Sequence, residues 1–297
     1  MKAGLVAVAI AALATAAYAQ PARVDRGTPI AIVGATIHVK PGQVIEKGTL
    51  VIDRGKVTAV GAGVKAPAGA TVIDGTGKVV TAGLVDGISG VGLVGIELEP
   101  DAVDGRFAAT DTVHDDPVHA SYQARDGFDP RDVTVPVARS GGLTTVVAAP
   151  SGGLVAGQSA AFALDGSVEP LRAPAALHVT LGPAGGAAAG GSRGKSIELL
   201  RELLDDARTF GRDRAAYERN AKRHMLADRL DLEALQPVLA RQVPLIVEAQ
   251  GESDIRAALR IAKQFNVRIA IAGGAEAWRV APELAVAKVP VLLDPTA

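Results

Sequence analysis

The sequence predicts an α/β fold in which a small β unit precedes a parallel sheet with crossover helices. Short β-rich runs separated by turn residues occupy the region from Pro29 to Asp74. After Gly75, apolar runs alternate with longer polar or helix-patterned stretches, which is typical of parallel strands buried on both faces. Aromatic residues make up only 3% of the chain while Ala, Val and Gly are plentiful, so we expect a core of small and β-branched side chains.

Composition narrows the classes of function. A chain of 297 residues, of which 48% are hydrophobic, is long enough to bury a sizeable core. The formal net charge is -1 and charged residues are scattered, which argues against a nucleic-acid partner and favours a small-molecule ligand or substrate. The chain contains no cysteine, so it has neither a thiol nucleophile nor a thiolate metal site.

The N-terminus has the pattern of a secretory signal peptide. Lys2 precedes an apolar run from Leu5 to Ala17, and Ala17-Tyr18-Ala19 supplies the small residues that a signal peptidase requires. We predict a signal peptide over residues 1–19 with cleavage before Gln20, and hence an exported, periplasmic or extracellular protein. The apolar run is shorter than the roughly 20 residues that span a bilayer, so no membrane association is expected after cleavage.

Residues 20–78 are expected to form the small β unit. Tight turns at Pro41-Gly42 and Arg54-Gly55 separate its short strands, which indicates an antiparallel arrangement. The expected strands are Ile30 to Val39, Thr49 to Asp53, Lys56 to Val60 and Thr71 to Asp74.

Residues 79–297 are expected to form an α/β barrel of about six strands. A closed (β/α)8 barrel needs eight, so the pattern predicts a partial TIM-like barrel whose last strands are missing from the sequence up to Ala297. The Gly- and Ala-rich stretch from Gly182 to Gly194 has no period and is expected to be a mobile loop beside a site. The expected strands are Val79 to Ile88, Thr144 to Ala149, Ala176 to Leu181, Pro244 to Ala249, Arg268 to Ala272 and Pro290 to Asp294. The expected helices are Ser196 to Phe210 with Ser196 as its N-cap, Leu232 to Arg241, Ser253 to Phe265 and Ala275 to Ala287, with Asp254 and Glu276 in first turns.

Two short patterns are interpreted as chance or as ordinary structure. The run from Gly190 to Gly194 matches the G-x-S-x-G pattern of a nucleophile elbow, but no helix is expected directly after its serine. His114 and His119, beside Asp115 and Asp116, are interpreted as residues of a solvated loop. His178 lies in an apolar strand and is interpreted as a hydrogen-bonded core or pocket histidine.

Several longer segments resemble one enzyme family. The run from Gly77 to Asp86 looks like the first barrel strand of the amidohydrolase superfamily, which ends there in a His-x-His pair that binds metal. Other segments resemble the imidazolonepropionase-like exported branch of that superfamily, and all of them occur in the expected order from about Ile30 to the end of the chain. These segments are Gly127 to Pro130, Ser140 to Val146, Gly157 to Ser159, Gly274 to Val280 and Val289 to Val291.

The resemblance implies a β-sandwich beside a distorted (β/α)8 barrel. It also implies zinc or another divalent metal, a metal-bound hydroxide and hydrolysis of carbon-nitrogen bonds in non-peptide or cyclic amides. In this sequence, however, the positions of the metal ligands hold residues that do not make a zinc site, so no cofactor is predicted. These residues are Ile88 and Gly90 in place of His-x-His, Glu248 and Gln250 in place of His-Ala-His, and Gly273 in place of a later histidine.

Three interpretations stay open. The first is a metal-dependent hydrolase, which the missing ligands contradict. The second is a pseudoenzyme, a non-catalytic module for binding a ligand or a partner, with Glu248, Gln250 and Gln158 in a polar pocket; the residues favour this one. The third is a metal-free hydrolase with Glu248 as general base and a pKa raised by burial. The resemblance also suggests a homodimer.

Overall fold

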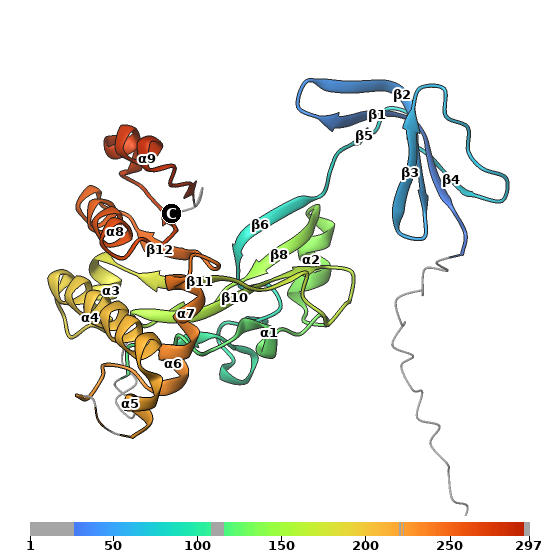
Figure 1. The fold of residues 1–297 in the computed structure, drawn as a ribbon. Helices are drawn as coiled ribbons and strands as arrows, with labels where there is room; N and C mark the ends of the chain where they lie inside the picture. Colours follow the sequence, from blue (N-terminus) through green and yellow to red (C-terminus); the bar gives the residue numbers. More distant parts are fainter. Residues whose placement is uncertain (1–26, 108–115, 220, 222, 294–297) are drawn as a thin grey trace, which may run out of the picture. The chain divides into compact units, whose positions relative to one another are not determined.

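The computed structural model describes residues 27–107, 116–219, 221 and 223–293 (Figure 1). The predicted signal peptide, together with His114, Asp115 and Asp294, lies outside these residues. The chain divides into two compact units, Met1–Ala82 and Gly83–Ala297. Among the described helices, none has the length and apolar character needed to cross a membrane.

The described part of the first unit forms one five-stranded sheet. Its strands are β1 (Ile30–Lys40), β2 (Gln43–Asp53), β3 (Lys56–Gly61), β4 (Thr71–Asp74) and β5 (Val79–Val80). The expectation of a purely antiparallel unit is wrong, because β4 and β5 both pair with β1 in parallel. The expected sandwich stays a prediction, since these residues form a single sheet.

The expected tight turn between β2 and β3 is confirmed. Asp53 pairs with Lys56 across the two residues Arg54 and Gly55. Both turn residues have positive φ, 47° and 76°, as a two-residue hairpin loop that follows the strand twist requires. A glycine at the second position adopts this backbone without steric cost.

The second unit is built on a curled sheet of mixed direction. Seven described strands follow the order β14-β13-β12-β11-β10-β8-β6, and all neighbouring pairs are parallel except those of β10. A Cβ at Gly87 in β6 would lie 3.3 Å from a methyl carbon of Leu292 in β14, so the two edges of the sheet approach each other. The strands are β6 (Leu84–Ser89), β8 (Leu143–Ala148), β10 (Val155–Ala163), β11 (Arg172–Thr180), β12 (Leu245–Ala249), β13 (Ile269–Gly273) and β14 (Val291–Leu292). The barrel-like α/β architecture expected from the sequence is thereby confirmed.

Two strand expectations need correction. The single strand expected from Val79 to Ile88 is divided, with Val79–Val80 in the sheet of the first unit and Leu84–Ser89 in that of the second. Strand β10 was not expected, although it lies in the middle of the barrel sheet between β8 and β11.

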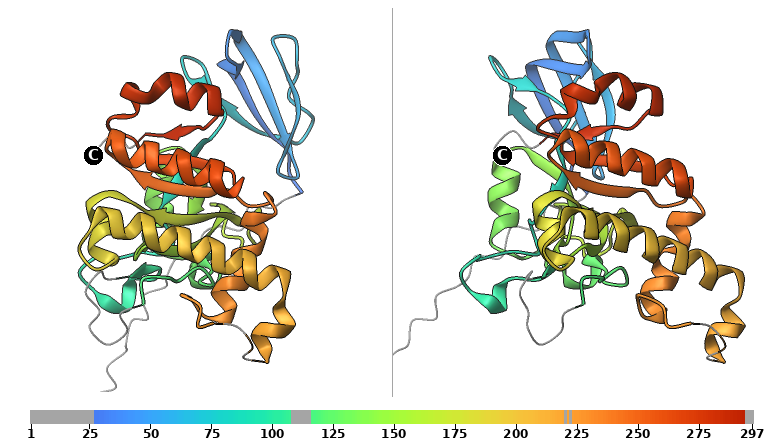
Figure 2. Two further views of the ribbon diagram at one scale, coloured as in Figure 1. Left: turned by 60° about the vertical axis from the view of Figure 1, so that its left-hand side comes forward. Right: turned by 90° about the vertical axis from the view of Figure 1, so that its left-hand side faces the viewer.

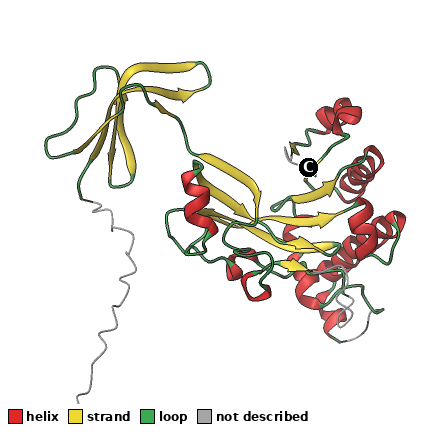
Figure 3. Ribbon diagram, turned by 180° about the vertical axis from the view of Figure 1, so that it is seen from behind, coloured by secondary structure: helices red, strands yellow, loops and turns green. Residues whose placement is uncertain are grey.

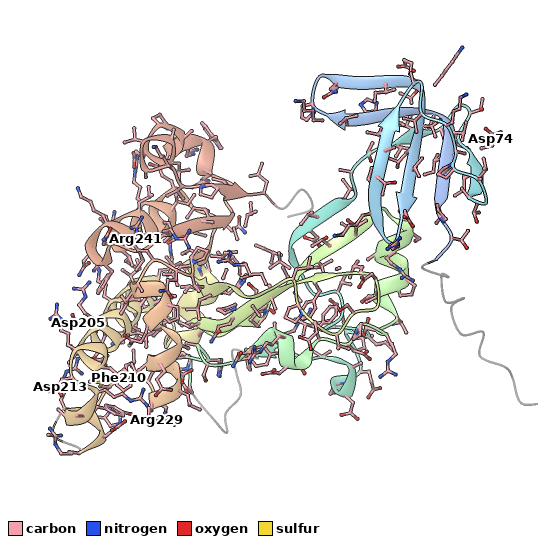
Figure 4. The ribbon with its side chains drawn as sticks, turned by 45° about the vertical axis from the view of Figure 1, so that its right-hand side comes forward. Asp74, Asp205, Phe210, Asp213, Arg229 and Arg241 are labelled. Atoms are coloured by element: carbon pink, nitrogen blue, oxygen red, sulfur yellow. The ribbon has the colours of Figure 1, made fainter. Side chains whose placement is uncertain are left out.

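Helices cover the outer face of the sheet, where they enclose the main core. Leu177, Val179, Leu245 and Val247 point toward them and are almost fully buried. Figure 2 shows α4, α8 and α9 following one another along this side, and Figure 3 shows them in red against the yellow strands. Phe210, labelled in Figure 4, closes one end of this core at 2% exposure. The main helices are α4 (Arg193–Arg212), α6 (Arg229–Ala234), α7 (Gln236–Leu239), α8 (Glu252–Phe265), η2 (Ala277–Val280) and α9 (Ala281–Ala287).

Shorter elements complete the described part of the second unit. They are η1 (Pro100–Ala102), β7 (Arg106–Phe107), α1 (Ala124–Gly127), α2 (Thr134–Ser140), β9 (Ser151–Gly152), α3 (Gly182–Ala188) and α5 (Arg214–Glu218).

Three helix expectations were wrong in detail. The stretch from Gly182 to Gly194 contains α3 and the start of α4 instead of a loop. The N-cap of α4 is Ser192, whose Oγ accepts from the Lys195 N–H, whereas Ser196 is buried in the first turn. The helix expected from Leu232 to Arg241 is two short helices, because Pro237 cannot donate a backbone hydrogen bond at that point.

Candidate functional site

A cavity of about 780 Å³ opens on the inner face of the curled sheet. This volume lies within the range of roughly 300–1,000 Å³ that is usual for small-molecule sites. Strands β6, β10, β11, β12, β13 and β14 all contribute to it, together with the segment around β9. Its polar lining is Asp86, Ser151, His178, Thr180, Glu248 and Gln250, and its apolar lining includes Val85, Ile88, Ala156, Ile246, Ala272, Leu292 and Leu293.

The strand register arranges the lining in two layers. Thr180 pairs with Glu248, Glu248 with Ala272 and Ala272 with Leu292, which places these four residues in one row across the sheet. Because side chains alternate between the two faces of a strand, residues two positions earlier share the same face. The row formed by His178, Ile246 and Ala270 therefore lies directly below the first, deeper in the barrel.

His178 is a buried polar group of the cavity wall. It is 7% exposed, and among the described protein groups its Nε2 atom has no hydrogen-bond partner. Burial lowers the pKa of His178 from 6.5 to about 4, so the ring is neutral at physiological pH. The prediction of a pocket histidine agrees with this position, but the expected hydrogen bond is not seen among the described residues.

Asp86 was missed as a candidate site residue, and His178 was interpreted as a core or pocket histidine without being named among the ligand-binding residues. For His178 a signal existed: once residues 176 to 181 are read as a strand, Ala176, His178 and Thr180 must share one face. Asp86 gave no such signal, because β6 has a register irregularity between Asp86 and Ser89. In the structure the Oδ1 atom of Asp86 accepts a hydrogen bond from the backbone N–H of Ile88 at 3.2 Å.

Glu248 on β12 and Gln250, one residue past the end of that strand, both line the cavity, as their spacing of two predicted. The side chain of Gln250 is braced, since its Oε1 atom accepts a hydrogen bond from the Ala275 N–H at 3.2 Å. Glu248 is exposed to the cavity. The burial that the metal-free hydrolase interpretation assumed for Glu248 is therefore wrong.

Gln158 lies outside the cavity lining, so its expected place in the pocket is wrong. Its Nε2 atom donates to the carbonyl oxygen of Ala120 at 3.0 Å. The pairing of β10 with β11 shifts register between Val155 and Gly157, and Gly157 has φ 120°. A one-residue shift reverses which face each following side chain occupies, and it turns Gln158 toward the Ala120 segment.

The positions that the resemblance assigns to metal ligands do not fit a divalent metal. Ile88 and Gly273 line the cavity together with Glu248 and Gln250, while Gly90 does not. Among the described residues, no group of three His, Cys, Asp or Glu side chains lies close enough together to hold a metal ion. A zinc site needs three or four such ligands.

The backbone at Gly273 is itself adapted to glycine. Its φ is 80°, and a Cβ built there would lie 2.2 Å from Nε2 of Gln250. The amide of Gln250 thus fills the space that a side chain at position 273 would enter. A histidine in this position would meet both backbone strain and a steric clash.

We expect Gly273→Ala to lower the free energy of unfolding by about 1 to 2 kcal/mol, because the added Cβ would be strained at this positive φ and would clash with Gln250. Urea unfolding measures this loss. The double variant Gly273→Ala with Gln250→Ala should recover the part due to the clash but not the part due to φ. Gly90→Ala is the matched control, because a Cβ there lies at least 3.7 Å from its neighbours. Equal losses in the two single variants would contradict this account.

Two other sequence patterns have structural roles. The ring of His119 stacks on Phe107 with 4.0 Å between centroids, and the Oδ1 atom of Asp116 accepts from the Val118 N–H at 2.9 Å. The expectation that no helix directly follows Ser192 is wrong, because α4 begins at Arg193. Ser192 nevertheless follows helix α3 instead of a strand, so it lacks the strand-turn-helix setting of a nucleophile elbow.

Comparisons with known proteins agree with the barrel. No protein-family model matches the chain, and no curated protein matches it significantly. Among solved structures, an amidohydrolase from Thermotoga maritima MSB8 is similar over 90% of this chain and 70% of its own, with 27% sequence identity and a TM-score of 0.77.

Two further structures show weaker likeness. A prolidase in complex with N-methylphosphonate-L-proline is 15% identical with a TM-score of 0.41, and another amidohydrolase is 16% identical with a TM-score of 0.40. Each covers 90% of this chain and 66% of its own length. These two likenesses are too weak to carry an argument. The likeness to the Thermotoga protein supports the amidohydrolase superfamily, a superfamily of hydrolases, for this chain.

Proposed function

We propose that this chain is an amidohydrolase-fold protein that binds a small molecule in the cavity without the metal-bound hydroxide of its superfamily. One observation supports the proposal: the cavity is lined by Ile88, Gln250 and Gly273, at positions where the sequence resemblance leads us to expect metal ligands. Restoring a ligand at position 273 would require both the backbone and the Gln250 amide to move.

The polar groups that remain in the cavity fit the binding of a small molecule better than they fit metal chemistry. Glu248, Thr180 and His178 are polar groups spread over two layers of a wall that also presents apolar side chains. A few polar groups placed among apolar side chains are typical of small-molecule sites, where they fix the orientation of the ligand. Export from the cell, with cleavage before Gln20, belongs to the same proposal.

Metal content tests this proposal before any ligand is known. The full-length protein is purified from medium supplemented with zinc, iron and manganese and its metals are measured by elemental analysis. We expect much less than one metal ion per chain, because the described cavity offers no set of three suitable ligands. A zinc-dependent amidohydrolase purified in parallel is the control. One or two tightly bound ions per chain would overturn the proposal.

A second candidate is hydrolysis of a carbon-nitrogen bond without metal, with Glu248 as general base. The observation in its favour is that this carboxylate is exposed to the cavity, where a bound ligand would meet it. Turnover of simple amides by metal-free protein, abolished by Glu248→Gln, would favour this candidate over binding alone.

A further inference from the structure

The charges of the cavity lining are all of one sign. Asp86 on β6 and Glu248 on β12 approach it from strands that are not neighbours in the sheet. Among the described lining residues there is no lysine or arginine. Anionic ligands in such a cavity would meet these carboxylates and, among the described lining residues, no compensating cation.

The buried wall adds a hydrogen-bonding group that lacks a partner. His178 lies one layer below Glu248, and its Nε2 atom is unpaired among the described protein groups. A buried polar atom without a partner is unfavourable, so a ligand that reaches this layer and hydrogen-bonds to the ring would be stabilised. The neutral imidazole does not repel a positive charge, as a protonated one would.

The apolar part of the wall favours an organic cation over a metal ion. Ile246 and Ala272 lie beside His178 and Glu248 in their rows, and Leu292 closes the upper row. Calcium needs roughly six to eight oxygen ligands, and magnesium needs a near-octahedral set of ligands. The described lining offers no such set, but it offers hydrocarbon surface for an alkyl chain.

We propose that the cavity binds a small organic cation, an ammonium or guanidinium group on a short apolar chain, with Glu248 and Asp86 as its charge partners. The hydrocarbon part contacts Ile246, Ala272 and Leu292, and an N–H group of the ligand reaches the layer of His178. This inference rests on the proposed function, since it names the ligand class of the same cavity.

Three probes of similar shape and different charge test the inference on the full-length protein. Butylguanidinium is the cation, N-butylurea its neutral analogue and pentanoate the anion. Isothermal titration calorimetry should show butylguanidinium binding at least about tenfold tighter than N-butylurea, the gain of one charge-assisted hydrogen bond, and no binding of pentanoate.

Variants show which carboxylates cause the preference for the cation. Glu248→Gln should lower the preference for butylguanidinium over N-butylurea by about tenfold while the urea still binds, and Asp86→Asn should lower it in the same direction. Glu169→Gln, which removes an exposed carboxylate outside the cavity lining, should leave the preference unchanged. Chemical shift changes of the His178 ring on adding butylguanidinium confirm the location.

The two proposals fail in different ways. Equal binding of the cation and the urea, or tighter binding of pentanoate, overturns the cation inference and leaves small-molecule binding in the cavity intact. Absence of butylguanidinium binding at millimolar concentration also overturns it. Metal content, measured separately, decides the proposed function.

Discussion

The free energy of unfolding of the second unit is expected to fall by about 3 kcal/mol as the pH falls from about 6.5 to about 4, because of His178 alone. Burial holds the pKa of His178 at about 4 in the folded chain, below the ordinary value of 6.5. Between these values the unfolded chain binds a proton that the folded chain does not. The free energy of unfolding therefore rises with pH through this window, and the contribution is fully present above 6.5.

Urea unfolding from about pH 4 to about pH 7 measures this contribution. Fluorescence of Trp278, the chain's one tryptophan, reports on the second unit. The pH dependence is read as the difference between the wild type and His178→Gln, because every other titratable group is common to both proteins. Thr180→Val is the control, since it alters the same wall without removing a titratable group. Parallel curves for the wild type and His178→Gln would contradict the expectation.

Much of the barrel could be predicted because its strands are apolar runs bounded by turns. Strands β11, β12 and β13 each contain a run of apolar residues whose outward side chains are buried against the helices. Strand β10 escaped prediction because Gly157, Gln158 and Ser159 interrupt its pattern. Only its neighbours β8 and β11, which come from elsewhere in the sequence, show that this segment is a strand.

Predictions for the site succeeded where strand alternation holds and failed where it does not. Alternation along β12, continued one residue past its end, placed Glu248 and Gln250 on one side, and both line the cavity. The same reasoning failed for Gln158, because Gly157 hints at an irregularity but only the pairing of β10 with β11 shows that the register shifts there. The braced position of Gln250 against Gly273 likewise requires a contact between β12 and the end of β13.

The stretch from Gly182 to Gly194 failed for a different reason, and the structure shows which contact orders it. Arg193, at the start of α4, donates to the Oδ1 atom of Asp254 through Nε at 3.2 Å and through a terminal nitrogen at 2.7 Å. Arg193 also donates to Ser253. Asp254 is 4% exposed in the first turn of α8, next to Gly182. A local sequence rich in Gly and Ala gives no sign of this anchor, which lies about 60 residues along the chain.

We therefore expect Arg193→Met to destabilise the second unit by about 3 kcal/mol, because it leaves the buried Asp254 carboxylate without its cation. Hydrogen exchange in residues 182–194 should become faster at the same time, since the contact that joins α3 and α4 to α8 is lost. Urea unfolding and hydrogen exchange with mass spectrometry measure the two effects. Replacing both partners, Arg193→Met with Asp254→Leu, should recover part of the loss, because no buried charge is then left unpaired.

Lys195→Met provides the matched control for this ion pair. Lys195 lies on the same helix and pairs with Glu198 at 2.9 Å, but both side chains are exposed. An exposed pair contributes at most about 1 kcal/mol, so this variant should change neither stability nor exchange by much. If Arg193→Met were no more destabilising than Lys195→Met, Asp254 would not anchor the segment. The order of residues 182–194 would then have to result from packing of α3 and α4 alone.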